Sequence, residues 1–250
     1  MDSVKNYPIN QTVNAPVNPV EPIKKTIKKT KKRVQDKLSF NTRTAGEEIG
    51  CAISHGAASA AFLAGTILMI VRCVSLGKSP LTVFAVAAFG FGFLAVYTTS
   101  FLYHTVTDLK VKKTLQVLDH CMIYVMICGS YAPVCLGMIK GVWGWAIWGV
   151  NVACMILGIV INLVDIHKFY RLSQTLYILM GWMIVVGAVQ MIRAIPLSGL
   201  LYLVAGGLLY TFGIIFYKMK DKKYMHLVFH LFVIAGSIPH FLFVLFYICR

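Results

Sequence analysis

Long apolar stretches alternate with short polar joints from residue 49 onward. The apolar segments lie at 49–71, 81–104, 115–138, 142–164, 174–193, 197–217 and 226–248. Each approaches the ~20 residues that a helix needs to cross the hydrocarbon core of a bilayer. The joints contain Lys, Arg, Pro or Gly, which interrupt apolar helices. The pattern predicts an all-α membrane protein, a seven-transmembrane helix bundle in the cell membrane.

The composition supports a membrane protein. Hydrophobic residues make up 58% of the chain and charged residues 13%, whereas soluble domains have ~45–50% apolar and ~25% charged residues. The seven cysteines include no CxxC pair. Their spacing therefore favours neither disulfides nor a thiolate metal site.

Residues 1–46 differ from the rest of the chain. They hold four prolines, and ten of the 24 Lys and Arg residues precede residue 44. Such a segment has too few apolar residues to bury a core, so we expect a disordered cytosolic tail followed by a transmembrane domain at 47–250. The basic tail is expected to contact anionic lipid head groups. A lysine run alone does not indicate binding to nucleic acid.

The distribution of basic residues predicts the orientation. Nine Lys and Arg residues lie in the second, fourth and sixth joints, on the same side as the basic tail, and five lie on the opposite side. Because basic residues are enriched on the cytosolic side of membrane proteins, the N-terminus is predicted to be cytosolic and the C-terminus outside.

Polar side chains occur in four of the segments at one depth, near the predicted inner surface. They are Glu48 in the first segment, Ser100 and His104 in the second, Asp119 in the third, and His226 and His230 in the seventh. An acid within a membrane segment is a candidate functional residue, because burying its charge is costly. Unrelated core residues would have no reason to share a depth.

The three imidazoles suggest a zinc site. His226 and His230 are four residues apart and therefore share one helix face. With His104 they form a three-histidine set, which in catalytic zinc sites leaves one position for water. Asp119 would take the proton of that water, and Ser100 would orient the water or a reacting carbonyl. The alternative is a metal-free polar cluster that ties the helices together.

Several motifs of the chain resemble one family. Glu48-Ile-Gly-Cys-Ala-Ile-Ser-His55, Ser100-Phe-Leu-Tyr-His104, Leu118-Asp119-His120 and His226-Leu-Val-Phe-His230 are similar to the hemolysin III branch of the progestin and adipoQ receptor family. This family lies within a superfamily that includes alkaline ceramidases. The resemblance covers about 47–250 and implies a zinc ion held by His104, His226 and His230. It further implies hydrolysis of a lipid amide or ester, with Asp119 and Ser100 beside the zinc-bound water.

Three other polar residues have open roles. Glu48 could be a partner of a ligand, a proton carrier or an acid favoured by the helix dipole. His55 lies about two helical turns beyond Glu48, and His240 lies roughly 15 Å beyond His230 at 1.5 Å per residue. Neither is expected to reach the same ion, so both are interpreted as hydrogen-bonded core histidines or as members of a proton or substrate path.

Three functions fit these observations. The first is a zinc-dependent intramembrane hydrolase of a lipid. The second is a non-enzymatic membrane sensor or regulator with a structural zinc, and the third is a haemolysin-like pore or ion conductor. The sequence leaves open the identity of the lipid, the oligomeric state and the choice of zinc over other metals that bind imidazole.

Overall fold

The computed structural model describes residues 23–24, 26–27, 30, 43–219 and 222–250. It divides into two units, residues 1–42 and 43–250. In the first unit, residues 23, 24, 26, 27 and 30 are helical and exposed. The other residues of the predicted disordered tail up to residue 42 lie outside the described residues. The contact of the tail with lipid head groups remains a prediction.

In the second unit, the described residues form helices joined by short turns and irregular segments, with no strand. Its elements are α2 (Ala45–Ser75), α3 (Pro80–Thr105), α4 (Leu109–Ala132), η1 (Pro133–Ile139), α5 (Gly141–Asp165), α6 (Tyr170–Trp182), η2 (Met183–Gly187), α7 (Ala188–Ala194), α8 (Leu197–Lys218), α9 (Met225–Phe243) and η3 (Val244–Ile248). Within the described residues, seven helices are long and apolar enough to cross a membrane. Three of these membrane-spanning helices are made of consecutive elements, namely α4 with η1, α6 with η2 and α7, and α9 with η3. The predicted fold class is confirmed.

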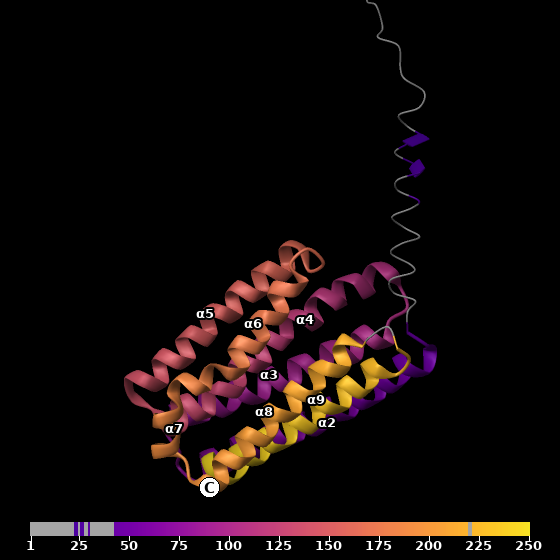
Figure 1. Ribbon diagram of the computed structural model, residues 1–250. Coiled ribbons are helices and arrows are strands. Elements are labelled where there is room, and N and C mark those ends of the chain that lie inside the picture. The colour runs from indigo at the N-terminus through magenta and orange to yellow at the C-terminus, as the bar shows by residue number, and fades with distance from the viewer. Residues whose placement is uncertain (1–22, 25, 28–29, 31–42, 220–221) are drawn as a thin grey trace, which may run out of the picture. The chain divides into compact units, whose positions relative to one another are not determined.

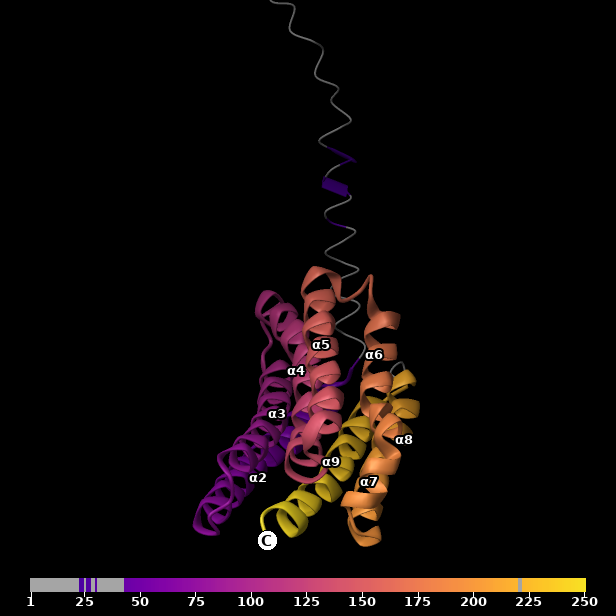
Figure 2. The same ribbon diagram turned by 90° about the vertical axis from the view of Figure 1, so that its left-hand side faces the viewer.

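The helices follow one another around the bundle (Figures 1 and 2). α3 packs most extensively against α2 and α4, and α8 packs against α9. The last helix, α9, also lies against the first, α2, and so closes the bundle. This arrangement brings the N-terminal ends of α2 and α9 to the same end of the bundle as the C-terminal end of α3.

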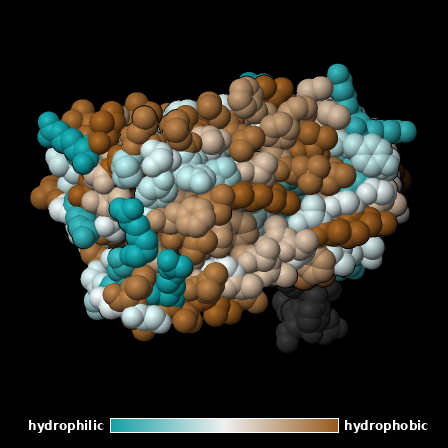
Figure 3. Space-filling model, turned by 90° about the horizontal axis from the view of Figure 1, so that it is seen from below, coloured by the Kyte–Doolittle hydropathy of each residue, from teal (hydrophilic) through white to brown (hydrophobic). Residues whose placement is uncertain are grey.

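The surface is apolar over much of the middle of the bundle, with hydrophilic residues toward its two ends (Figure 3). Large apolar side chains point outward on many of the helices, among them Ile67, Phe91, Leu163, Val186 and Leu201. Soluble monomers rarely expose contiguous apolar areas of this kind. The protein is therefore an integral membrane protein whose exposed apolar side chains face lipid.

Two glycines allow α3 and α4 to touch through their backbones. A Cβ atom at Gly129 would lie 2.6 Å from the carbonyl oxygen of Ala88. A Cβ atom at Gly92 would lie 2.9 Å from the carbonyl oxygen of Val125. Small residues at helix contacts permit such close approach in membranes. α3 and α4 therefore form a tightly joined pair, which fixes Ser100 and His104 relative to Asp119.

Polar caps set where two of these helices begin. The carboxylate of Asp108 accepts hydrogen bonds from the backbone N–H groups of Lys110 and Val111, at 2.8 Å and 3.0 Å. α4 therefore starts at Leu109, six residues before the apolar segment predicted from the sequence. Thr44 caps α2 by accepting a hydrogen bond from the backbone N–H of Glu47 at 3.2 Å.

Candidate metal centre

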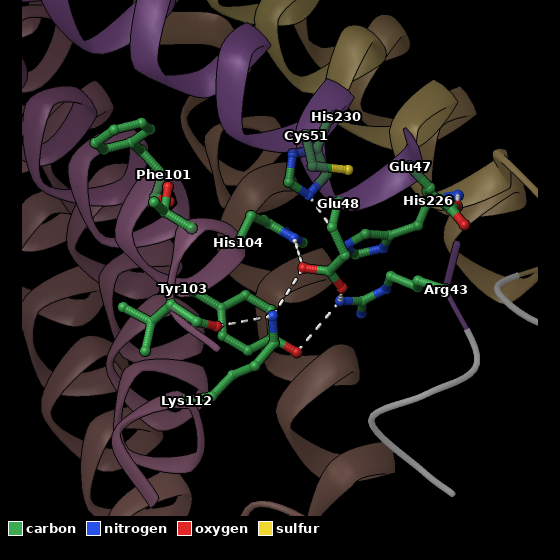
Figure 4. A network of polar contacts seen from close by, with 12 residues as sticks. Arg43, Glu47, Glu48, Cys51, Phe101, Tyr103, His104, Lys112, His226 and His230 are labelled. Atoms are coloured by element: carbon green, nitrogen blue, oxygen red, sulfur yellow. Dashed lines mark hydrogen bonds and ion pairs between the residues drawn. The ribbon is translucent and has the colours of Figure 1, made fainter. Parts of the chain in front are cut away.

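Four potential metal ligands meet between α2, α3 and α9 (Figure 4). They are Cys51, His104, His226 and His230, and their donor atoms all lie within 4.8 Å of one another. All four side chains are buried. The structure thus brings together the three histidines singled out in the sequence and adds a thiol to them.

The histidine pair of α9 is held at the start of its helix. The Nε2 atoms of His226 and His230 lie 3.1 Å apart, as their spacing of four residues predicts. α9 has no side-chain cap of its own at Tyr224. Instead, the backbone N–H of His226 donates to Glu47 Oε1 of α2 at 3.2 Å. Glu47 therefore fixes the position of the first turn of α9, and with it His226, relative to α2.

His104 presents one ring nitrogen to the cluster. Its Nδ1 atom lies 3.0 Å from Glu48 Oε2, so Nδ1–H donates to the carboxylate and Nε2 carries the lone pair. Nε2 is buried and makes no hydrogen bond to any described residue. A buried polar atom without a partner is costly. The geometry fits a metal-ligating histidine, whose second ring nitrogen commonly donates to a carboxylate.

Glu48 is itself held by two cations. Lys112 Nζ donates to Glu48 Oε2 at 2.8 Å, and Arg43 Nη1 lies 3.2 Å from Glu48 Oε1 (Figure 4). Arg43 also donates to the hydroxyl of Tyr103 at 3.2 Å. Of the roles left open for Glu48, these contacts favour a partner that orients His104, because a carboxylate fixed on three sides holds the imidazole in one direction.

Asp119 and Ser100 lie next to the cluster without joining it. Ser100 is buried on α3, one turn before His104. The Asp119 carboxylate is not one of the donor atoms that converge on the cluster. Its Oδ2 atom also lies 3.7 Å from His120 Nδ1. The arrangement agrees with a carboxylate that does not bind the metal directly.

The two deeper histidines differ from each other. His55 is buried, and its ring stacks on that of His230 with a centroid distance of 3.8 Å. His240 stacks on Tyr210 at 5.6 Å. Neither belongs to the group of converging donors. Both ring nitrogens of His55 are buried and make no hydrogen bond to any described residue, so the expectation of a hydrogen-bonded core histidine is wrong for His55. His55 instead supports the ring of His230 by direct contact, and a part in a proton or substrate path remains a hypothesis for both His55 and His240.

Two residues of the site differ from what the sequence indicates. The sequence predicts that Glu47 is a solvated neighbour of Glu48, which is wrong, because Glu47 is buried and accepts from the backbone N–H of His226. Closely spaced cysteine pairs are the usual sequence signal of thiolate ligands, whereas Cys51 contributes a single thiol from a different helix than the imidazoles. One signal was present: Cys51 lies three residues after Glu48 and four before His55, so all three share one face of α2.

The donor set suits a borderline or soft divalent metal. Imidazole nitrogen and thiolate sulfur are the common ligands of zinc in four-coordinate sites. Hard cations such as Mg²⁺ and Ca²⁺ prefer oxygen ligands, which the cluster does not offer among the described residues. The buried cluster can therefore hold a metal ion, and its chemistry fits zinc.

The family model described as "Haemolysin-III related" matches residues 44–241, which include most of the chain and all four candidate metal ligands. The chain belongs to the haemolysin-III-related family. The relative "Hemolysin-3" of Bacillus cereus is 32% identical over 213 residues, which cover 85% of this chain and 97% of that protein. The "Hemolysin-3 homolog" of Bacillus subtilis (strain 168) is 33% identical over 204 residues, 82% of this chain and 95% of that protein.

The haemolysin III relationship extends to animals. The human "Monocyte to macrophage differentiation factor" is 28% identical over 166 residues, 61% of this chain and 66% of that protein. This similarity supports the link to the progestin and adipoQ receptor family. The protein is thus a haemolysin III family member of the cell membrane with a candidate metal centre at one end of its helix bundle.

Proposed function

We propose that the protein is a zinc-dependent intramembrane hydrolase that cleaves an amide or ester bond of a lipid. The observation that carries the proposal is the buried convergence of His104, His226 and His230, which leaves the Asp119 carboxylate outside the set of ligands. A general base in such a site is a carboxylate that does not bind the metal. The family resembled by the sequence lies in a superfamily that includes alkaline ceramidases, which supports a lipid amide as the substrate class.

Each residue of the site would have a distinct role in the proposed hydrolysis. His104, His226 and His230 would hold the zinc, which supplies a Lewis acid able to polarise a carbonyl group. Asp119 would take the proton of the attacking water at a carboxylate oxygen. The Ser100 hydroxyl would orient the water or the reacting carbonyl, and Glu48 would keep His104 in its orientation. Burial of the cluster would exclude bulk water, so the lipid would enter from the bilayer.

The first test is the metal content of the detergent-purified protein, measured by elemental mass spectrometry beside the His226→Ala/His230→Ala variant. About one zinc per chain, absent from the variant, would be expected for the proposed site. Absence of metal from native protein purified without chelator would contradict the proposal and favour a metal-free polar cluster.

The second test concerns the reaction. The purified protein is incubated with ceramides and other N-acyl and ester lipids, and released fatty acid is measured. Asp119→Asn should retain the metal and lose turnover, whereas Asp165→Asn, at the exposed end of α5, should retain both. Loss of metal from Asp119→Asn would make Asp119 a ligand and would count against its role as the base.

Cys51 favours one alternative function. A site closed by four protein ligands is typical of structural zinc, and Cys51 supplies a fourth donor atom within the cluster. A non-enzymatic sensor whose zinc joins α2, α3 and α9 is therefore the second candidate. It predicts zinc binding without hydrolysis of any lipid in the screen.

A further inference from the structure

The thiol of Cys51 reaches the metal centre from a helix that carries none of the three imidazoles. His104 lies on α3, and His226 and His230 lie on α9, whereas Cys51 lies in the second turn of α2. Its side chain is completely buried, and its Sγ atom is within 4.8 Å of each imidazole donor atom. A fully buried thiol normally packs against apolar groups as a small hydrophobic residue. Here it faces ring nitrogens instead.

A second observation points to a ligand between these atoms. His104 Nε2 is buried, makes no hydrogen bond to any described residue, and is one of the donor atoms that converge with Cys51 Sγ. We propose that Cys51 is the fourth protein ligand of the metal, in a Cys-His₃ set that connects α2, α3 and α9. The inference rests on the metal site of the proposed function and adds a ligand to it.

A thiolate ligand changes which metals the site prefers. Sulfur ligands favour zinc and softer ions such as cadmium over magnesium and manganese, which prefer oxygen. In the proposed hydrolase, Cys51 would also occupy the position that a three-histidine site leaves for water. Turnover would then require either a fifth coordination position or release of Cys51, so Cys51 would restrain the activity of the resting protein.

Cobalt(II) in place of zinc gives a direct readout of sulfur ligation. The purified full chain is stripped of metal and loaded with cobalt alone, and bound cobalt is counted beside the absorption spectrum. We expect a thiolate-to-cobalt charge-transfer band in the near ultraviolet for the wild type. Cys51→Ser should lose this band and keep the bound cobalt, and Cys154→Ser, a partly exposed cysteine of α5, should keep both.

The possible results separate the two proposals. Bound cobalt without the band in the wild type, or a band that persists in Cys51→Ser, would overturn sulfur ligation and leave the histidine site intact. Failure of the wild type to bind cobalt would overturn the metal site itself and the ligand with it.

A measurement on the wild type alone tests the ligand even if the Cys51→Ser variant fails to fold. Cys51 should react more slowly with a small membrane-permeant alkylating reagent when zinc is bound, as judged by mass mapping of peptides. Equal rates with and without bound zinc would contradict ligation by Cys51.

A different pair of thiols lies at the opposite end of the bundle. The Sγ atoms of Cys73, near the end of α2, and Cys249, just beyond η3, are 3.1 Å apart. Arg72 Nε donates to the carbonyl oxygen of Cys249 at 2.6 Å and holds the two segments together. The sulfur atoms need to approach by only about 1 Å to reach the length of a disulfide bond.

We infer that Cys73 and Cys249 form a disulfide by exchange with a low-molecular-weight disulfide. Both thiols are fully buried, so the exchange requires the residues beyond η3 to separate from α2 and expose them. One thiolate attacks the external disulfide and releases one thiol, and the second cysteine then displaces the other thiol from the mixed disulfide. Two protein thiols are oxidised, and one external disulfide is reduced to two thiols. Sequence spacing did not indicate this pair, because its members are far apart in the chain and meet only through the packing of η3 against α2.

The test is the intact mass of the purified chain after incubation with oxidised glutathione. Loss of two hydrogens is expected for the wild type, with a Cys73–Cys249 cross-linked peptide after digestion without reduction. Cys249→Ser should show no cross-link at this position, and Cys154→Ser should behave like the wild type. An unchanged wild-type mass, or a cross-link between other cysteines, would overturn the inference.

Discussion

Glu48 shows how one partly buried carboxylate can position a metal ligand. It accepts from Lys112, lies against Arg43 and receives Nδ1–H of His104. A carboxylate with two cationic partners remains charged in a low-dielectric surrounding. Its hydrogen bond to His104 selects the tautomer in which Nε2 is free for a ligand.

Replacement of Glu48 by Gln is expected to weaken metal binding about 10–100-fold, the usual effect of removing a carboxylate partner from a ligating histidine. The neutral amide would hold the His104 ring less firmly and leave Lys112 and Arg43 without a negative charge. Competition with a chromogenic chelator measures the affinity. Asp165→Asn serves as the control, and equal affinities of the two variants would argue against the orienting role.

At the scale of helices, the contact between α3 and α4 depends on glycine. Backbone atoms of Ala88 and Val125 occupy the space that a Cβ atom at Gly129 or Gly92 would need. Gly207 on α8 instead faces open space, with no atom within 4 Å of such a Cβ. Gly129 and Gly207 are therefore a suitable pair for comparison, because both are helical but only Gly129 is tightly packed.

Gly129→Ala is expected to destabilise the protein by about 1–3 kcal/mol, the range for overpacking a tight contact. Gly207→Ala should be neutral or slightly stabilising, because alanine favours helix over glycine. Thermal unfolding in detergent compares both variants with the wild type. Similar unfolding temperatures for the two variants would show that α3 and α4 are not in backbone contact.

The start of α4 has a pH dependence of its own. The backbone N–H groups of Val111 and Lys110 donate to the Asp108 carboxylate and hold the pKa of Asp108 below its ordinary value. A carboxyl group with a lowered pKa stabilises the folded state above its unfolded pKa of about 3.9 and loses this contribution as the pH falls through its folded value.

Asp108→Ala should therefore lower the unfolding temperature at neutral pH. The difference from the wild type should begin to shrink as the pH falls below about 4, where the unfolded chain becomes protonated, and should be lost once the pH is below the lower folded pKa of Asp108. Unfolding scans at several pH values measure this difference. A difference that stays constant down to low pH would mean that the charge of Asp108 does not contribute.

For the whole molecule, hydrophobic patterning sufficed to predict the seven spans. Each predicted segment lies inside an observed span, but the ends were less accurate where polar residues continue a helix, as in the lysine-bearing first turns of α4. The His104, His226 and His230 cluster followed from their common depth. Cys51 did not, because its spacing places it on the same face of α2 as Glu48 and His55 but does not reveal which side chains of other helices lie opposite that face.

The orientation of the bundle is a prediction that fusions can test. Reporters that are active only outside the cytosol should work when attached at residue 250 and fail when attached in the joint between α8 and α9. A fluorescent protein that matures in the cytosol should give the opposite result. The physical reason is the excess of Lys and Arg on the side of the basic tail. The reverse pattern would contradict the assignment.

The tight pairing of α3 with α4 also limits how the bundle can open. His104, Ser100 and Asp119 belong to that pair and move together, whereas His226 and His230 lie on α9, which packs mainly against α8. Sliding α8 and α9 away from α3 would separate the imidazoles, so a bound ion would resist this movement. Metal binding should therefore slow the exchange of backbone amide hydrogens at the start of α9. A lipid would have to enter between other helices, because α3 and α9 would stay joined through the metal.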